Sequence, residues 1–296
     1  MQTIQAATPP RSENPLMSYM RSPKIYIRIP SNGAYWPEGS IEMPENGLLP
    51  VYSMTAKDEL TFKTPDALLN GQAVVDVIQS CIPNIKDAWQ TPTIDIDTLL
   101  VAVRIATYGE MLEISHTVPN TEELVSHQID LRVLLDQLST TNEWIEAVEC
   151  NEYITCYIRP LTYRHMSNVS LKTFEAQRLI QSANNDECDE DLKMSLYNQS
   201  INLMTDLNVD VIAESIKSIE TPDTVVTDKV FIREFLDNAD SGIYQKIQEH
   251  IGKLRESLGL QPITFEATPE QLELGAPTTY TVPITMDNSD FFVQKS

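Results

Sequence analysis

A helical segment that is apolar on nearly every side limits most strongly how this chain can fold. The segment runs from an expected N-cap at Asp97 to Ala106, and its apolar residues recur on more than one face. A helix without a polar face has to be covered on all sides by other elements. Gly109 follows at the position where a left-handed C-cap would end the helix. Hydrophobic residues make up 42% of the 296 positions, which is enough to supply that cover. We therefore expect a globular fold with this helix in its core.

Short extended segments are expected on both sides of the apolar helix. Lys24–Ile29 alternates apolar and polar residues, as a strand does, and Pro30–Gly33 has the composition of a turn. Met111–Thr117 and Tyr153–Ile158 are rich in β-branched and aromatic residues, and Val125–Leu131 is a further candidate strand. These segments predict small sheets beside the helix.

Two further helices are expected in the same part of the chain. Thr64–Asp66 has the order of a helix start, with a hydroxyl cap, then proline, then an acid. That helix would continue to Cys81, with Gly71 as a break and Pro83 as its end. Leu131–Leu138 predicts a short amphipathic helix or turn.

From Ser170 the sequence becomes helical in character. The last of the segments has the clearest pattern, with apolar residues at three- and four-residue spacing from Ile243 to Leu258, an expected cap at Ser241 and a stop at Gly259. The other expected helices are Leu171–Ile180, Leu192–Leu207, Val209–Ile219 and a short one from Val230 to Leu236.

The order of these segments predicts an α+β fold with a mixed N-terminal domain, a helical middle region and a short C-terminal β region. The expected divisions are a flexible N-terminal arm (1–22), a mixed α+β domain (23–167), a helical domain (168–259) and a C-terminal extended or β region (260–296). The arm is polar and proline-bearing, which is typical of a segment that becomes ordered against a partner.

The net charge of −22 excludes several classes of partner. A polyanion is repelled by phosphate backbones and by anionic lipid, so neither nucleic acid nor membrane is expected to bind. The sequence contains no run approaching the roughly 20 apolar residues that a membrane span requires. The first residues also lack the apolar region of a secretory signal, so we expect the chain to be intracellular when it is made.

Residues that could carry out chemistry do not converge in the sequence. The four cysteines lack C-x-x-C spacing and are expected to be reduced thiols, mostly packed as small hydrophobes. None of the histidines (His116, His127, His165 and His250) lies four residues from another, and the acidic run Asp186–Asp191 lacks the order of a calcium loop. Nucleophile-elbow and phosphate-loop motifs are also missing from the sequence. We therefore expect no catalytic residue, no metal and no cofactor.

Four stretches resemble the baseplate hub assembly protein family of T-even-type contractile-tail bacteriophages. Two are highly specific, because a helix, a turn, a buried helix and an R-x-x-x-Y-G motif follow in order through Lys57–Ile85 and Asp95–Ile114. The other two are IPSNGAYW (Ile29–Trp36) and the terminal DNSDFFVQKS. Arg104 and Tyr108 of the R-x-x-x-Y-G motif lie on one helical face, and we expect them to fix the corner between the helix and the next strand.

This resemblance implies a structural or assembly component of the baseplate hub that acts through protein–protein contacts and is not an enzyme. The implied partners are other tail and baseplate proteins (hub, tape-measure and spike components), and the chain would be an oligomer within that assembly. It would occupy the host cytoplasm during assembly and the virion tail baseplate afterwards. Two alternatives stay open, namely an assembly chaperone absent from the mature virion and a cell-wall hydrolase of the tail hub. The hydrolase alternative rests only on the 43 acidic residues, because paired carboxylates are defined by their separation in space.

The chain departs from the resembled family at two loops. Many relatives carry cysteine pairs there, whereas this chain has HTVPNTEE (His116–Glu123) and FEATPEQL (Phe265–Leu272). If the relatives bind zinc at those loops, this chain is expected to hold them by packing and hydrogen bonds instead. Candidate interface residues are the aromatic ones, which dominate interface hot spots. They are Phe291, Phe292, Tyr35 and Trp36.

Overall fold

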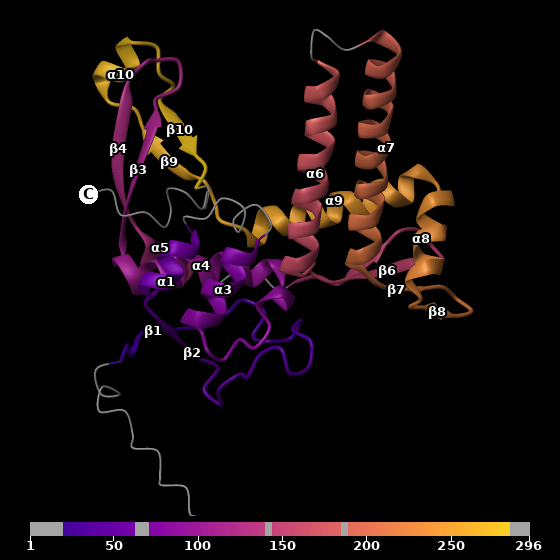
Figure 1. The fold of residues 1–296 in the computed structure, drawn as a ribbon, viewed down its shortest axis with the longest axis horizontal. Coiled ribbons are helices and arrows are strands. Elements are labelled where there is room, and N and C mark those ends of the chain that lie inside the picture. Colours follow the sequence, from indigo (N-terminus) through magenta and orange to yellow (C-terminus); the bar gives the residue numbers. More distant parts are fainter. Residues whose placement is uncertain (1–19, 63–70, 140–143, 185–188, 285–296) are drawn as a thin grey trace, which may run out of the picture.

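A computed structural model describes residues 20–62, 71–139, 144–184 and 189–284, and these residues adopt an α+β fold. The predicted fold class is therefore confirmed. Within these residues the buried apolar side chains form three clusters. Two projections rise from one side of the body, one built mainly of strands and the other of two long helices (Figure 1). The expected helix start at Thr64–Asp66 lies outside the described residues.

The largest cluster surrounds the apolar helix α4 (Thr93–Tyr108), whose residues Leu99, Val101 and Val103 are fully buried. The β1–β2 ribbon, α3 and α5 pack directly against α4, while α1 and the 3-10 helix η2 pack against α3. The bounds of these covering elements are β1 (Pro23–Ile27), β2 (Leu49–Tyr52), α1 (Ala56–Phe62), α3 (Gln72–Cys81), η2 (Ala88–Gln90) and α5 (Leu131–Ser139).

Helix α4 begins at Thr93, one turn earlier than expected, so the prediction of Asp97 as its N-cap is wrong. The Thr93 N–H donates to the backbone oxygen of Leu161 at 2.8 Å, which satisfies one of the donors left free at a helix start. This partner is distant in the sequence, so no local signal marks it. Asp97 lies inside the helix. Gly109 ends the helix at the predicted position, but its φ of 89° and ψ of 178° lie outside the left-handed helical region that was expected.

The strand-built projection combines two antiparallel ribbons from distant parts of the chain (Figure 1). Its first ribbon pairs β3 (Met111–Thr117) with β4 (Leu124–Asp130), and its second pairs β9 (Ile263–Glu266) with β10 (Thr279–Val282). Helix α10 (Pro269–Glu273) connects β9 to β10. The smallest apolar cluster, which contains Val118, Ala276 and Tyr280, lies between the two ribbons.

The second cluster lies beneath a four-stranded antiparallel sheet with the order β5-β6-β7-β8. Strands β6 and β7 pair although they come from either side of residue 167, the expected domain boundary. Helices α8 and α9 contribute Ile232, Ile247 and Ile251 to this cluster. The elements are β5 (Ala147–Glu149), β6 (Thr155–Ile158), β7 (Ile216–Glu220), β8 (Val225–Val226), α8 (Lys229–Asn238) and α9 (Ser241–Leu258).

The second projection consists of the helices α6 (Tyr163–Ala183) and α7 (Glu190–Ser215). Two helices were expected over Leu192–Ile219, but the structure has one, followed directly by the strand β7. Ile216 and Ile219 end up in a strand because β6 offers them backbone partners and an apolar cluster. That choice depends on tertiary pairing rather than on local propensity.

The N-terminal ends of α9 and α3 show two further local features. The cap of α9 is Asp240, whose carboxylate accepts from the Gly242 N–H at 2.7 Å, so the prediction of Ser241 is wrong by one residue. Gly71 precedes α3 with a φ of 78°, and a Cβ there would lie 2.8 Å from the Ser167 hydroxyl of α6. Glycine is therefore required both by its conformation and by the close approach of α6.

Candidate interaction surface

The four aromatic interface candidates occupy different environments. Trp36 is buried, and its indole N–H donates to a carboxylate oxygen of Asp95 at 2.8 Å, so it presents little surface to a partner. Tyr35 is half-buried and meets the ring of Trp144 edge-on, with 6.3 Å between centroids. Phe291 and Phe292 lie outside the described residues. Their roles at an interface remain predictions.

The Arg104–Tyr108 pair has the geometry expected of a structural corner. The guanidinium of Arg104 lies 4.6 Å from the centre of the Tyr108 ring, and burial lowers the pKa of Arg104. Arg104 is 6% exposed, and its Nε and Nη1 have no hydrogen-bond partner among the described residues. The stacking on Tyr108 therefore holds this cation at the end of α4, just before Gly109 turns the chain into β3.

The two loops that lack the family's cysteine pairs lie against each other in the strand-built projection. His127 stacks on Phe265 with 4.2 Å between centroids, and His116 stacks on both His127 and Phe265 at 5.3 Å. Tyr280 closes the group, with its hydroxyl 3.3 Å from Nε2 of His116. Burial and the neighbouring His127 lower the pKa of His116, which favours the neutral ring.

Hydrogen bonds complete this junction. Thr268 and Gln271 form a reciprocal capping box at the start of α10, and the backbone oxygen of the buried Gln271 accepts from the Ala276 N–H at 2.9 Å. The side chain of Asn120 donates to the backbone oxygen of Gly275 across the two loops at 3.4 Å. No group of three metal-ligating side chains occurs within the part of the chain that the structure describes. Aromatic packing and hydrogen bonds join the two loops in the structure.

The most buried carboxylates among the described residues take part in structural networks. Asp95 accepts from the backbone and hydroxyl of Ser31 at 2.9 and 2.5 Å as well as from Trp36. Asp58 accepts from the Thr55 hydroxyl at 2.8 Å and the Ser80 hydroxyl at 2.9 Å. These acids hold loops and helices together, and each is already satisfied by protein donors.

The α6–α7 hairpin is held by small residues where its helices touch. Ala176 and Ala183 of α6 and Ser200 of α7 are buried, and the Ser200 hydroxyl donates to the Ala176 backbone oxygen at 3.0 Å. Near the tip, the Tyr197 hydroxyl donates to the side chain of Asn184 at 2.6 Å. Small residues let two helices approach closely, but they leave most of each helix surface outside the contact.

One side of this hairpin carries large apolar side chains, and it is uncharged between Met166 and Ile180 on α6 and between Met194 and Ile201 on α7, with Glu190 and Asp191 at its tip. On α6, Met166, Phe174 and Ile180 fall within about 120° of the helix surface and are 40%, 43% and 39% exposed. On α7, Met194 and Ile201 share a face and are 65% and 61% exposed. The polar residues interspersed on these two faces are neutral, namely Ser170, Thr173, Gln177, Gln181, Asn198 and Thr205.

The two faces belong to the same side of the hairpin. On each helix, the exposed apolar residues lie about 100° around the helix axis from the residue that contacts the other helix, which is Ala176 on α6 and Ser200 on α7. The sense of this rotation, followed from the N-terminus to the C-terminus, is the same on both helices. Because the helices are antiparallel, equal rotations bring both sets to one side. We call this surface the neutral face; it comprises Met166, Phe174, Ile180, Met194 and Ile201.

A cavity of about 430 Å³ continues the neutral face at the base of the hairpin. Met166 and Val169 of α6 line it together with Ile94, Trp144 and Leu258, so its wall is largely apolar. The charged groups of its lining are Arg159, Arg255 and the carboxyl of Asp97, whose pKa is raised by burial, so the cavity is positive overall. Helix α9 supplies part of its wall and crosses behind the hairpin in Figure 1. The neutral face therefore leads into a hollow that an apolar side chain can enter.

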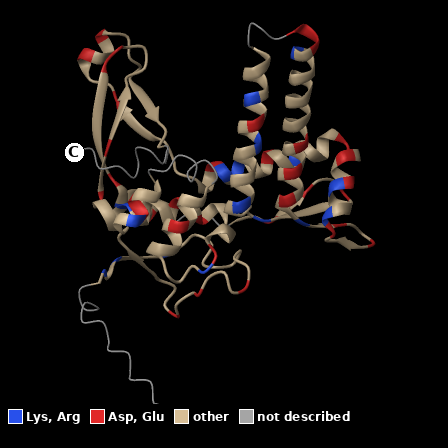
Figure 2. Ribbon diagram, in the orientation of Figure 1, with Lys and Arg blue, Asp and Glu red and all other residues tan. Residues whose placement is uncertain are grey.

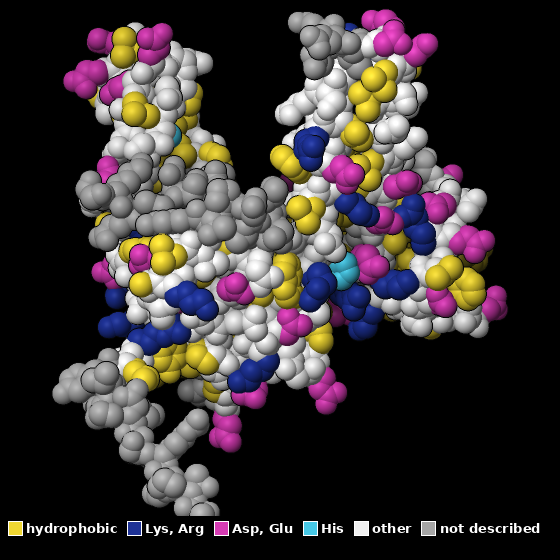
Figure 3. Space-filling model, in the orientation of Figure 1, with side chains coloured by type: hydrophobic (Ala, Val, Ile, Leu, Met, Phe, Trp, Pro, Cys, Tyr) yellow, Lys and Arg dark blue, Asp and Glu magenta, His cyan; other side chains and the backbone are white. Residues whose placement is uncertain are grey.

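The opposite side of the hairpin base is charged. A second cavity of about 510 Å³ there is lined by Lys172, Asp210, Glu214, Lys229 and Arg233 among others. At the base of the hairpin Figure 3 shows basic and acidic side chains gathered around a histidine. Lys229 donates to three backbone oxygens at the end of α7, at 2.7 to 3.0 Å, which stabilises the helix terminus. Acidic residues also collect at the far tip, where α7 begins (Figure 2).

The sequence pattern did not single out the neutral face. Its members are spread over two helices, and each helix alone reads as a weakly amphipathic segment. The absence of charge on one arc of each helix is the signal that could have found it.

These features define an α+β protein with a projecting helical hairpin, one side of which is apolar and largely uncharged. Residues 44–258 match the family described as T4 bacteriophage base plate protein, and since this is more than half of the chain, the chain belongs to that family. The resemblance identified from the sequence is thereby confirmed at the level of a T4-type baseplate protein. Neither a search of the curated proteins nor one of the solved structures found a match. The described helices include none with the length and apolar character needed to cross a membrane.

Proposed function

We propose that this baseplate protein is a structural subunit or assembly factor of the baseplate hub, and that it binds a neighbouring tail protein through the neutral face of α6 and α7. The proposal rests on one observation: the neutral face, with its exposed apolar side chains, lies on a hairpin that projects from the body. Interface cores are depleted in charge and enriched in methionine and aromatic residues, as this face is. Exposed apolar side chains gathered on one surface are typical of a binding site.

The partner that fits this face is an amphipathic helix or extended segment of a neighbouring tail protein. Its apolar side chains would lie on the neutral face, and one of them would enter the cavity beside Trp144. Acidic groups on the same segment would meet Arg159 and Arg255 at the base. The partner is thus expected to be apolar along its length and acidic at one end.

The test replaces exposed apolar residues of the neutral face with lysine. Phe174→Lys and Ile201→Lys keep good helix formers at exposed positions, so folding should be unchanged while affinity for co-expressed hub proteins falls by about tenfold or more. Val133→Lys is the matched control, because Val133 is 54% exposed on α5, which lies outside this face. Pull-downs of tail proteins and circular dichroism would measure both properties. Unchanged capture by both variants would disprove the role of this face.

Mass spectrometry of purified virions separates the structural subunit from the assembly chaperone. Stoichiometric amounts in the mature tail identify a structural subunit. Absence from the tail, together with failed hub formation in a deletion mutant, identifies a chaperone. Normal tails in the deletion mutant would contradict both forms of the proposal.

A further inference from the structure

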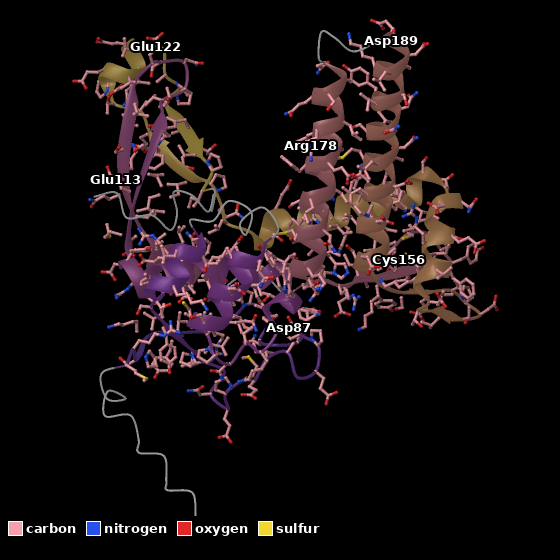
Figure 4. The ribbon with its side chains drawn as sticks, in the orientation of Figure 1. Asp87, Glu113, Glu122, Cys156, Arg178 and Asp189 are labelled. Carbon is pink, nitrogen blue, oxygen red and sulfur yellow. The ribbon has the colours of Figure 1, made fainter. Side chains whose placement is uncertain are left out.

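Two buried cysteines on neighbouring strands form a site that the proposed function does not use. The sulfur atoms of Cys150 and Cys156 lie 3.5 Å apart, within hydrogen-bond distance of each other, and both thiols are free. Cys156 pairs with Val148 across the β5–β6 ladder, and Cys150 follows Val148 by two residues. Alternate residues of a strand share a face, so both sulfurs point to the same side of the sheet. Figure 4 labels Cys156 on its strand.

The surroundings make one of the two thiols reactive. A hydrogen bond with Cys156 lowers the pKa of Cys150 to about 7, and the ammonium of Lys246 acts in the same direction. That ammonium is fixed nearby, because it donates to the Cys150 backbone oxygen at 2.8 Å. The hydrogen bond with Cys150 and burial raise the pKa of Cys156. The pair therefore contains one thiolate nucleophile and one protonated partner near neutral pH.

Both thiols are buried, with Cys150 2% and Cys156 0% exposed, so a small reagent has to approach through the chain beside them. The connection Asn151–Tyr153 is exposed and lies directly beside Cys150. A cavity of about 260 Å³ borders β5 and is lined by Val148 and Lys246. Cys81 is buried as well, but there burial raises the pKa of the thiol to about 12. Reactivity is therefore expected at Cys150 and not at Cys81.

We propose that Cys150 and Cys156 are a dithiol site that hydrogen peroxide converts into a disulfide between β5 and β6. In the first step the Cys150 thiolate attacks one peroxide oxygen, the O–O bond breaks, and hydroxide leaves and takes up a proton as water. In the second step the Cys156 sulfur attacks the resulting Cys150 sulfenic acid, its thiol proton leaves with the departing hydroxyl as water, and the S–S bond forms. Two thiols and one peroxide thus give one disulfide and two molecules of water.

The geometry permits this bond with little rearrangement. A disulfide requires sulfurs about 2.05 Å apart, so the pair has to close by roughly 1.5 Å, which side-chain rotation and the exposed connection can provide. Strand β5 has three residues and lies at the edge of its sheet, and helix α9 packs against it. A disulfide would fasten this edge strand covalently to β6. It would stabilise the second apolar cluster without altering the neutral face.

The experiment uses the purified, reduced full-length chain and hydrogen peroxide alone. After treatment, free thiols are alkylated in denaturant and peptides are mapped by mass spectrometry. We expect a peptide linked through Cys150 and Cys156, alkylated Cys81, and a melting temperature raised by about 5 °C that returns on reduction. Cys81→Ala is the matched control and should form the same link.

The variant Cys156→Ser provides a second, independent test of the dithiol site. Cys156→Ser removes the resolving thiol, so a sulfenic acid should accumulate on Cys150 and be trapped by dimedone. Both cysteines alkylated after treatment, or Cys150 oxidised to sulfinic acid in the wild-type chain without a link, would overturn the proposal. No partner protein is involved, so failure here is distinct from failure of hub binding. Phe174→Lys is expected to oxidise like the wild type.

Discussion

At the scale of single residues, burial decides which polar groups have structural roles. Asp95 is fully buried beneath the loop that contains Ser31 and Trp36, and three donors converge on its carboxylate. Sequence reasoning placed Asp97 at a helix start and gave Asp95 no structural role. The network joins residues about 60 positions apart, so only the folded chain brings them together. A local pattern cannot contain that information.

The pH dependence of folding should reveal Asp95. Burial raises its pKa from 3.8 to about 6, against the opposing effect of its hydrogen bonds. Between these two values the folded state binds more protons than the unfolded state, so this group's contribution to stability is full below about pH 4 and is lost as the pH rises through 6. The free energy of unfolding is expected to fall by about 3 kcal/mol across this pH range.

Urea unfolding across this pH range would measure the effect, with Asp95→Asn as the comparison. The asparagine cannot ionise, so the difference in unfolding free energy between the two proteins should narrow or reverse as the pH rises. A constant difference would show that the Asp95 carboxyl titrates at its ordinary pKa. Asp76→Asn, at an exposed position of α3, serves as the control for a surface carboxylate.

At the scale of elements, periodicity identified most helices but not their ends or partners. The apolar α4 and the stripe of α9 were predicted because their patterns are strong and continuous. The division of α7 from β7 was not, because a short segment such as IKSI is compatible with either state until β6 pairs with it. The neutral face was missed for a related reason, since it arises only when two helices are placed side by side.

The junction of the two ribbons gives a prediction about metal independence. Tyr280→Ala removes a buried ring from the His116–His127–Phe265 group and should destabilise the strand-built projection by about 3 kcal/mol. Tyr26→Ala, at an exposed strand position, should cost little. Hydrogen exchange of β3 and β4 would measure the change. A chelator should leave the melting temperature unaltered, and a drop on chelation would show that a metal holds these loops.

At the scale of the whole molecule, α+β class and membership of the baseplate family followed from the sequence, whereas the arrangement of its parts did not. The sheet of the second cluster takes strands from both sides of residue 167, and the division into four regions remains a prediction. The α6–α7 projection holds the neutral face away from the body (Figure 1). Its exposed apolar side chains make this face our candidate for contact with a neighbour.

The beginning of the folded body can be located by comparing a truncation with a point substitution. Arg21, placed in the expected arm, donates to the backbone oxygens of Ser53 and Ser80 at 2.6 Å and lies 3.7 Å from a carboxylate oxygen of Asp58. Arg21→Ala should therefore lower stability by about 1–2 kcal/mol, because two backbone acceptors lose a charged donor. Removal of residues 1–19 leaves this anchor in place and should leave the melting temperature unchanged.

The same truncation distinguishes two modes of binding to the hub. If partners are held by the folded surface, the chain without residues 1–19 should capture tail proteins as the full chain does, while Phe174→Lys captures fewer. If the arm carries the contact, the truncated chain should lose capture and Phe174→Lys should keep it. Additive losses would mean that both segments contact a partner, since independent sites contribute additively to binding free energy. We expect the first outcome, because the neutral face is formed before any partner binds and needs no ordering on association.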